Sequence, residues 1–304
     1  NIKLIEIKVI TDKTEFFEFK DKWNRLLDKS PNPHIHFTFE WMKYWIEVFG
    51  NQVQLYILTA YESGELIGIA PLCIIKKGKL PANTLKFRQL VFMGYGFQDA
   101  ADFIITKEKD AVLNAFIMKA INDEDIWDET ELRQISNHSV NYNVLYEIIK
   151  GFEGKYNTDN NFLIGCPYLE IEGSFDSYYS SLGTSWTKKN EYIRQLNALG
   201  LLEFKVEEKI SDILLKEILE LNIKRNKATG RRSIFLEKKK SEFINLMLPE
   251  FSEMNRLRIF CLRHNGKLVT YSISFFYNNK IYRWNTSFNL DYQKYSVGRV
   301  LTKY

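Results

Sequence analysis

The stretch LRIFCLRHNGKLVTYSISFFYNNKIYRWNTSFNLDYQKYSVGRVL, from Leu257 to Leu301, is the part of the sequence that indicates the fold most clearly. Its apolar residues predict three strands separated by turns at His264-Asn265-Gly266 and Tyr277-Asn278-Asn279. Asn-Gly is a strong hairpin signal because a type I′ turn needs positive φ at both central residues. We therefore expect an antiparallel meander of three strands.

A possible anion site follows the meander. Ser296-Val297-Gly298-Arg299 precedes an apolar run that looks like the start of a helix. The start of a helix presents unpaired N–H groups and the positive end of the helix dipole, and a glycine there lets an anion come close. The stretch thus predicts a phosphate-binding turn, and the alternative is an ordinary meander followed by an ordinary helix.

The strand, turn and strand pattern also occurs early in the chain. The residues that recur 202 positions later are Leu55, Ile57, Gly64, Leu66 and Ile67, matched by Leu257, Ile259, Gly266, Leu268 and Val269. A repeat at a constant offset indicates two similar units. The length of 304 residues also favours about two domains.

Strand and helix patterns alternate in both halves, which predicts the α/β class with mixed sheets (α+β). Pro71 lies within a predicted strand and indicates a bulge or a parting of strands, because proline lacks the ladder N–H. Thr38 is placed to cap a helix that begins at Phe39.

The unit boundary is predicted in residues 151–161, which are rich in Gly and Asn and lack periodicity. This gives an N-terminal unit of residues 1–155 and a C-terminal unit of residues 156–304. Residues 162–171 predict a strand that enters the second unit.

Charge is divided unevenly along the chain. Residues 1–159 carry 19 Lys and Arg against 23 Asp and Glu, whereas residues 160–304 carry 23 against 15. A basic half predicts an anionic partner such as a phosphate-bearing cofactor, but the excess is too scattered to favour duplex nucleic acid. No apolar run approaches the roughly 20 residues of a transmembrane helix.

Cysteine and histidine usage exclude two kinds of site. Cys73, Cys166 and Cys261 lie far apart in apolar stretches, which predicts buried free thiols in a reducing, cytoplasmic setting. His34 and His36 have no evident third ligand, so we expect no metal site. The chain starts without Met and stops inside a predicted helix, so we expect it to be part of a longer protein.

Six pieces of sequence carry a family resemblance. They are Phe37-Thr38-Phe39-Glu40-Trp41, Gly68-Ile69-Ala70-Pro71-Leu72, Asp99-Ala100-Ala101-Asp102-Phe103-Ile104, Lys188-Lys189-Asn190 with Arg194, Leu219-Glu220-Leu221 with Lys224-Arg225, and Tyr295-Ser296-Val297-Gly298-Arg299. In this order and spacing they resemble the GNAT acyltransferase superfamily. The branch is the two-lobed CelD-like one and, more distantly, the FemAB-like aminoacyl transferases. Val297 departs from the proline usual in the family, and the chain ends before a further Asp-Phe and Tyr-Lys region.

The resemblance implies two tandem GNAT-like lobes related by a pseudo-two-fold axis, with acyl-CoA as co-substrate of the second lobe. It implies that strands 268–276 and 281–286 part, and that a backbone N–H in the gap polarises the thioester carbonyl. The cofactor-binding residues that it implies are Tyr282, Trp284, Tyr295, Ser296, Val297, Gly298 and Arg299.

The resemblance also implies direct attack by an amine or hydroxyl, without an acyl-enzyme. Asp99 and Asp102 match the acidic positions of the family and are candidate general bases. The alternative is that Asp99 caps its loop and Asp102 is solvated. Asn285 is a further polar candidate for catalysis. Lys188, Arg194 and Arg225 are candidates to bind an acidic acceptor or cofactor phosphates, and the alternative for each is a solvated helix face.

The function expected from the resemblance is an acyl-CoA-dependent, acetyl-CoA first, N- or O-acyltransferase with a small polar or glycan-like acceptor. Two alternatives stay open. One is a Fem-like transferase that takes its aminoacyl group from aminoacyl-tRNA, and the other is a GNAT-like binding module without activity.

Overall fold

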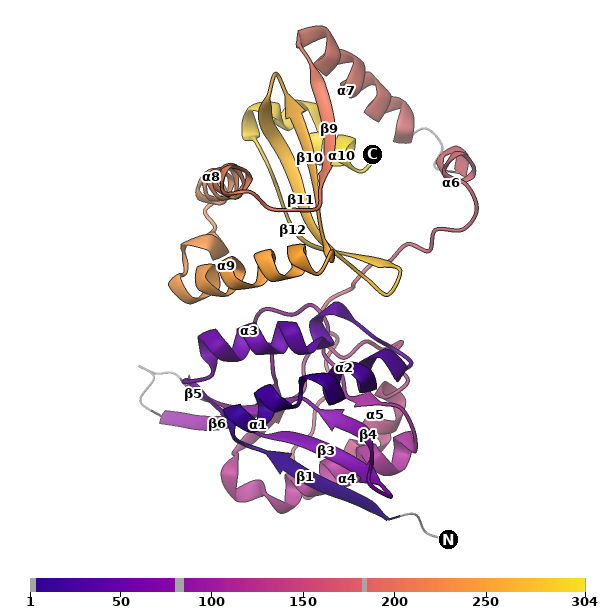
Figure 1. Cartoon of the computed structure of the whole chain (residues 1–304), viewed down its shortest axis with the longest axis vertical. Helices are drawn as coiled ribbons and strands as arrows, with labels where there is room; N and C mark the ends of the chain where they lie inside the picture. The colour runs from indigo at the N-terminus through magenta and orange to yellow at the C-terminus, as the bar shows by residue number, and fades with distance from the viewer. Residues whose placement is uncertain (1–3, 80–84, 182–184, 304) are drawn as a thin grey trace. The chain divides into compact units, whose positions relative to one another are not determined.

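The computed structural model describes residues 4–79, 85–181 and 185–303, and the chain forms two compact units, Asn1–Leu163 and Ile164–Tyr304. Each unit combines β-sheets with helices, which confirms the predicted mixed α/β class (Figure 1). The division between the units lies eight residues beyond the predicted boundary. Among the described helices, none is long and apolar enough to cross a membrane.

Unit 1 contains two sheets of four strands each. The first sheet has the order β1-β3-β4-β7, and its strands are β1 (Ile5–Ile10), β3 (Ile57–Glu62), β4 (Glu65–Ala70) and β7 (Ile104–Ile105). The second has the order β2-β5-β6-β8, with β2 (Val53–Leu55), β5 (Leu72–Lys79), β6 (Leu85–Phe92) and β8 (Glu129–Glu131). The helices are α1 (Lys13–Glu18), α2 (Lys20–Lys29), α3 (Phe39–Phe49), α4 (Lys109–Asn122) and α5 (Tyr142–Lys150), with 3₁₀ turns η1 (Ile35–Phe37) and η2 (Glu124–Ile126).

Pro71 marks the point at which the chain passes from the first sheet to the second. β4 ends at Ala70 and pairs with β3, whereas β5 begins at Leu72 and pairs with β2 and β6. The Pro71 carbonyl still accepts from the Met93 amide at 2.8 Å, although the ring has no N–H to donate. The predicted parting of strands at Pro71 is therefore confirmed.

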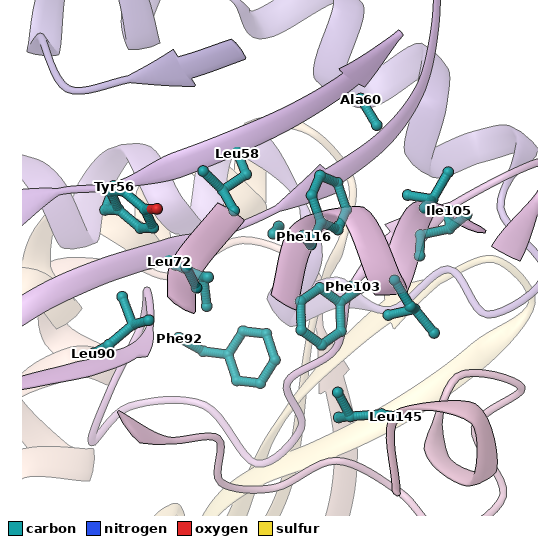
Figure 2. Close-up of a cluster of buried hydrophobic side chains, with 14 of the residues drawn as sticks. Tyr56, Leu58, Ala60, Leu72, Leu90, Phe92, Phe103, Ile105, Phe116 and Leu145 are labelled. Carbon is teal, nitrogen blue, oxygen red and sulfur yellow. The ribbon is translucent and has the colours of Figure 1, made fainter. Parts of the chain in front are cut away.

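One hydrophobic cluster of unit 1 packs α4 and α5 against β3 and β4 of the first sheet and β5 and β6 of the second (Figure 2). The rings of Phe103 and Phe116 stack with centroids 6.0 Å apart, and Phe92 meets Phe103 edge-on at 5.2 Å. Gly68 of β4 allows this closeness, because a Cβ there would lie 2.7 Å from Val112 Cγ1 of α4. Figure 1 shows α1 to α3 on the opposite side of the sheet from α4.

Unit 2 is built on one antiparallel sheet. Its strand order is β12-β11-β10-β9, with β9 (Leu202–Glu207), β10 (Leu257–His264), β11 (Lys267–Tyr277) and β12 (Lys280–Phe288). Its helices are α6 (Phe175–Ser181), α7 (Ser185–Leu199), α8 (Asp212–Ala228), α9 (Lys238–Glu253) and α10 (Val297–Leu301), with 3₁₀ turns η3 (Ile234–Leu236) and η4 (Leu290–Tyr295). Figure 1 shows α8 and α9 on one face of the sheet and α7 and α10 on the other.

The internal repeat is confirmed. The elements of the two units correspond in chain order. β1 corresponds to β9, α1 and α2 to α8, η1 to η3, and α3 to α9. β2 with β3 corresponds to β10, β4 with β5 to β11, and β6 to β12. Gly64 and Gly266 occupy equivalent turns, and both have positive φ. Unit 2 has no proline at the position of Pro71, and β11 continues as a single strand where unit 1 breaks into β4 and β5.

Two predictions were wrong. Residues 162–171 form no strand, and their apolar side chains, among them Phe162 and Ile171, are exposed. A short apolar run forms a strand only if a sheet edge is available to pair with it, and the sequence does not reveal that edge. Cys73 and Cys261 are buried as expected, but Cys166 lies in this exposed stretch.

Candidate functional site

The start of α10 has two backbone amides that lack a backbone acceptor within the described part of the chain, and there is open space beside Gly298. Ser296 precedes the helix with φ of 47°, and its carbonyl accepts from the Arg299 amide at 2.7 Å and the Val300 amide at 3.1 Å. The amides of Val297 and Gly298 come before these bonds and have no backbone acceptor among the described residues. A Cβ on Gly298 would meet no atom within 4 Å. This turn is thus a pair of N–H donors with room for an oxyanion.

Positive side chains gather along the same helix. The Lys189 Nζ of α7 donates to Thr302 Oγ1 at 3.3 Å, and the Lys303 Nζ donates to Asn190 Oδ1 at 2.9 Å, so α7 and α10 are joined. Partial burial, and next the nearby charge of Arg299, lower the pKa of the Lys189 ammonium. Since Lys189 and Arg299 are close enough to repel, an anion bound between them would relieve that repulsion.

The predicted parting of strands 268–276 and 281–286 is wrong. β11 and β12 pair from Thr270 opposite Phe288 to Tyr277 opposite Lys280. The irregularity is a single bulge, in which Ile273 faces Asn285 and Ser274 faces Arg283, so that Trp284 is the extra residue. Among the described residues β12 pairs with β11 alone, which makes it an edge strand with backbone groups free on its outer side.

The bulge turns Trp284 and Asn285 toward α8 and α9. Trp284 packs on Phe275 with ring centroids 5.8 Å apart, and Asn285 Oδ1 accepts from the Tyr271 hydroxyl at 2.8 Å. The Asn222 amide of α8 donates to both Tyr271 Oη and Asn285 Oδ1. The Asn285 oxygen is therefore committed to joining β12 to α8, on the face of the sheet opposite α10.

The other aromatic candidates are also packed. Burial raises the pKa of the Tyr282 phenol to about 12. Tyr295 and Val297 are buried in the cluster that joins α7, α10 and the sheet, so that only their backbone atoms are available to a ligand. The structure brings Ser296, Gly298 and Arg299 together at the start of α10, but it does not bring the side chains of Tyr282, Trp284 and Asn285 to them.

In unit 1, Asp102 is a buried structural carboxylate. It accepts from the Phe103 amide at 2.8 Å, from Asn141 Nδ2 at 2.9 Å and from the Ser139 hydroxyl. Burial raises its pKa, and these donors oppose the rise. The alternative expectation that Asp102 is solvated is wrong, because 4 % of the residue is exposed. Its bonds fix the turn that leads into α5.

Asp99 lies in a different setting, three residues earlier on an exposed loop. Among the described residues its carboxylate accepts no hydrogen bond of the expected capping kind; instead, the Asp99 backbone amide donates to His36 Nδ1 at 3.1 Å. Although the residue is accessible to solvent, the protein packed around it desolvates the carboxylate and raises its pKa. His36 is buried and neutral, because burial, and next the charge of His34, lower its pKa well below the usual value.

The three predicted acceptor-binding cations lie apart within unit 2. Arg225 stacks on Phe288 with its guanidinium carbon 4.4 Å from the ring centroid, and it lines a cavity of about 280 Å³ between α8 and the ends of β11 and β12. Arg194 is exposed and paired with Glu191, and Lys188 is exposed on α7. Among the described residues, no group of three or more His, Cys, Asp or Glu side chains could hold a metal ion.

Comparison with known proteins shows what this chain is similar to. The model of the acetyltransferase (GNAT) domain matches residues 187–304, which include the start of α10, β12 and α7 from its third residue. The crystal structure of FemX has a TM-score of 0.62 to this chain at 12 % identity, over 98 % of this chain and 84 % of FemX. Residues 187–304 thus match a GNAT domain, and the fold of the chain is similar to that of FemX. It has two GNAT-like units, in agreement with the resemblance read from the sequence.

A tandem GNAT protein from the clavulanic acid biosynthesis pathway is also similar, at 8 % identity and a TM-score of 0.42, over 98 % of this chain and 83 % of that protein. No curated protein sequence matches the chain.

Lys189 lies at this candidate site, whereas the sequence pattern had favoured Lys188. Its position had a signal. Ile193 and Leu196, four and seven residues beyond Lys189, form the buried side of α7, so that Lys189 shares their face and Lys188 does not. Arg283 was also missed; its Nε donates to Ser272 Oγ at 3.4 Å, beside Ser274.

Proposed function

We propose that the chain is an acyl-CoA-dependent N- or O-acyltransferase, with acetyl-CoA as its first candidate donor, acting on a small polar or glycan-like acceptor. The observation that supports the proposal most is the open turn at Val297 and Gly298, where two amides without backbone acceptors lie beside Arg299 and Lys189. Amides at a helix start and adjacent cations suit a pyrophosphate.

In the proposed reaction the acceptor nitrogen or oxygen attacks the thioester carbonyl carbon directly. The new C–N or C–O bond forms, the C–S bond breaks, and coenzyme A leaves and takes a proton. The carbonyl oxygen gathers negative charge in the transition state and needs a fixed N–H donor. Because β11 and β12 do not part, we assign this donor to the outer edge of β12 near the bulge at Trp284.

Asp99 is the proposed general base. A base must lose its proton near neutral pH and regain one from the attacking group, and a raised pKa brings a carboxylate closer to that range. Asp102 is less suited, because its oxygens already hold three donors. The cavity beside Arg225 is slightly below the usual range for ligand pockets, about 300 Å³ and above, which favours a small acceptor.

Binding of acetyl-CoA tests the proposal. The intact chain should be stabilised against heating by acetyl-CoA, because a ligand that binds only the folded state raises its apparent stability. Release of coenzyme A should then be measured with a panel of amines and sugars. Absence of any thermal shift with acetyl-CoA and longer acyl-CoA esters would reject the donor assignment.

A second candidate is transfer from aminoacyl-tRNA in the manner of Fem-like enzymes, which is favoured by the similarity of fold to FemX. Retention of aminoacyl-tRNA on a filter by the protein, together with no thermal shift from acyl-CoA, would support this candidate. Binding of acetyl-CoA without release of coenzyme A to any acceptor would instead favour a binding module.

A further inference from the structure

Eight of the cations of the chain are concentrated in 17 residues that we call the basic flank, from Lys224 to Lys240. They are Lys224, Arg225, Lys227, Arg231, Arg232, Lys238, Lys239 and Lys240, and the stretch contains one carboxylate, Glu237. Elsewhere the chain has 34 Lys and Arg against 37 Asp and Glu, so the positive net charge of the protein originates here.

The fold holds the basic flank together on one side of unit 2. It comprises the end of α8, the loop after it, η3 and the first turn of α9, which Figure 1 shows following one another beside the sheet. Lys227, Arg231, Arg232 and Lys238 are exposed. The weak pair of Lys224 with Asp291, at 3.8 Å between two largely exposed side chains, neutralises little of this charge.

The first turn of α9 is unfavourable for the helix itself. Lys238, Lys239 and Lys240 occupy the positive end of the helix dipole, the turn contains no acidic residue, and the Glu237 side chain makes no capping bond. Cations at this end oppose the dipole and one another. Glu237 pairs with Lys240 at 3.1 Å and offsets one of these three charges. An anionic surface outside the protein would compensate the charge that remains.

An apolar residue lies in the middle of these cations. Leu236 is 54 % exposed, although its neighbour Phe235 is buried and the Ser233 side chain caps the turn that carries it. A leucine side chain has no favourable interaction with phosphate groups, but its burial below the headgroups of a bilayer is favourable. The one aromatic residue of the stretch is the buried Phe235, so the flank offers no ring on which nucleic-acid bases could stack.

We propose that the basic flank binds an anionic membrane surface, with the cations on lipid phosphates and Leu236 among the acyl chains. This inference is independent of the acyl-donor site. Juxtamembrane cations attract anionic lipid strongly enough that each contributes about a fivefold factor in binding near the surface. The exposed residues Arg231, Arg232 and Lys238 should therefore account together for about a hundredfold.

Vesicle sedimentation with the intact chain tests the proposal. The protein should sediment with phosphatidylcholine vesicles that contain about 30 % phosphatidylglycerol, and not with pure phosphatidylcholine, and salt should release it. The variant Arg231→Gln/Arg232→Gln/Lys238→Gln should bind about a hundredfold more weakly. Leu236→Ser should bind about tenfold more weakly, with an unchanged dependence on salt.

The matched control is Lys209→Gln/Lys216→Gln/Lys280→Gln, which removes the same charge from exposed positions of unit 2 outside the basic flank. It should bind as the parent does. Equal weakening by both triple variants would overturn the proposal in favour of net charge. Absence of binding to anionic vesicles, or tighter binding to a structured RNA that displaces the vesicles, would overturn it as well. Circular dichroism of each variant confirms that it is folded.

Discussion

Gly298→Asp should abolish tight binding of acetyl-CoA without damaging the fold. A Cβ at Gly298 meets no atom within 4 Å, and the residue lies in the first turn of α10. An acidic side chain at this end of a helix is favourable by about 0.3–1 kcal/mol. The variant should therefore be at least as stable as the parent protein, and any loss of binding will be electrostatic.

The size of the loss follows from Coulomb's law. A carboxylate on Gly298 would lie about 4 Å from a phosphate held by the Val297 and Gly298 amides, and at an effective dielectric of about 20 this repulsion is about 4 kcal/mol. That energy corresponds to roughly a thousandfold rise in Kd. The nearby Arg299 attenuates the repulsion, so we expect a rise of at least about thirtyfold.

Isothermal titration with acetyl-CoA measures the effect, and Gly298→Asn is the matched control because its side chain has the same size without the charge. The Asp variant should recover part of its affinity at high salt, since the Debye length shrinks from about 10 Å at 0.1 M to about 3 Å at 1 M. Equal affinities of the Asp and Asn variants, when the parent binds, would refute the assignment of the phosphates to this turn.

Three further predictions concern unit 1. Asp99→Asn should lower turnover about a hundredfold and leave the affinity for the donor unchanged, whereas Asp102→Asn should lower the free energy of unfolding by about 1–3 kcal/mol; the reverse pattern would exchange their roles. Because the folded-state pKa of His36 is depressed, urea unfolding should show stability lost as the pH falls below about 6.5, by at most about 1.4 kcal/mol per pH unit, and His36→Asn should remove this slope. Gly68→Ala should lower the free energy of unfolding by about 1–3 kcal/mol in the same assay, because its Cβ would crowd Val112 of α4. Adding Val112→Ala should restore part of that stability, and no loss in the Gly68→Ala variant would contradict the prediction.

The sequence predicted those features of the fold that depend on one or two neighbouring residues or on a repeated pattern. Asn265-Gly266 predicted a hairpin because few other pairs adopt positive φ at both positions, and both residues do. Pro71 predicted the break between β4 and β5, because a proline has no N–H to donate and so interrupts the hydrogen bonding of any sheet. The offset of 202 residues predicted two similar units from turn glycines and apolar positions alone.

The direction of side chains in β12 was not predictable in this way. A strand pattern has a period of two residues, and the extra residue at Trp284 shifts that period without leaving a mark in the sequence. For this reason Asn285 faces α8, although its position suggested a lining residue. Residues 162–171 illustrate a second limit, because an apolar run can suggest a strand without showing which strand it would pair with.

Val297 illustrates why a departure from the family pattern need not remove a site that is built from backbone. Proline is usual at this position and has no N–H. The first position of a helix tolerates the missing N–H, because that N–H has no partner within the helix. Valine restores the N–H, while its side chain is buried with Val300 and Leu301 and holds α10 on the sheet. The turn therefore presents one more donor with valine than with proline. The departure from proline at Val297 thus increases the number of amides that a phosphate could meet there.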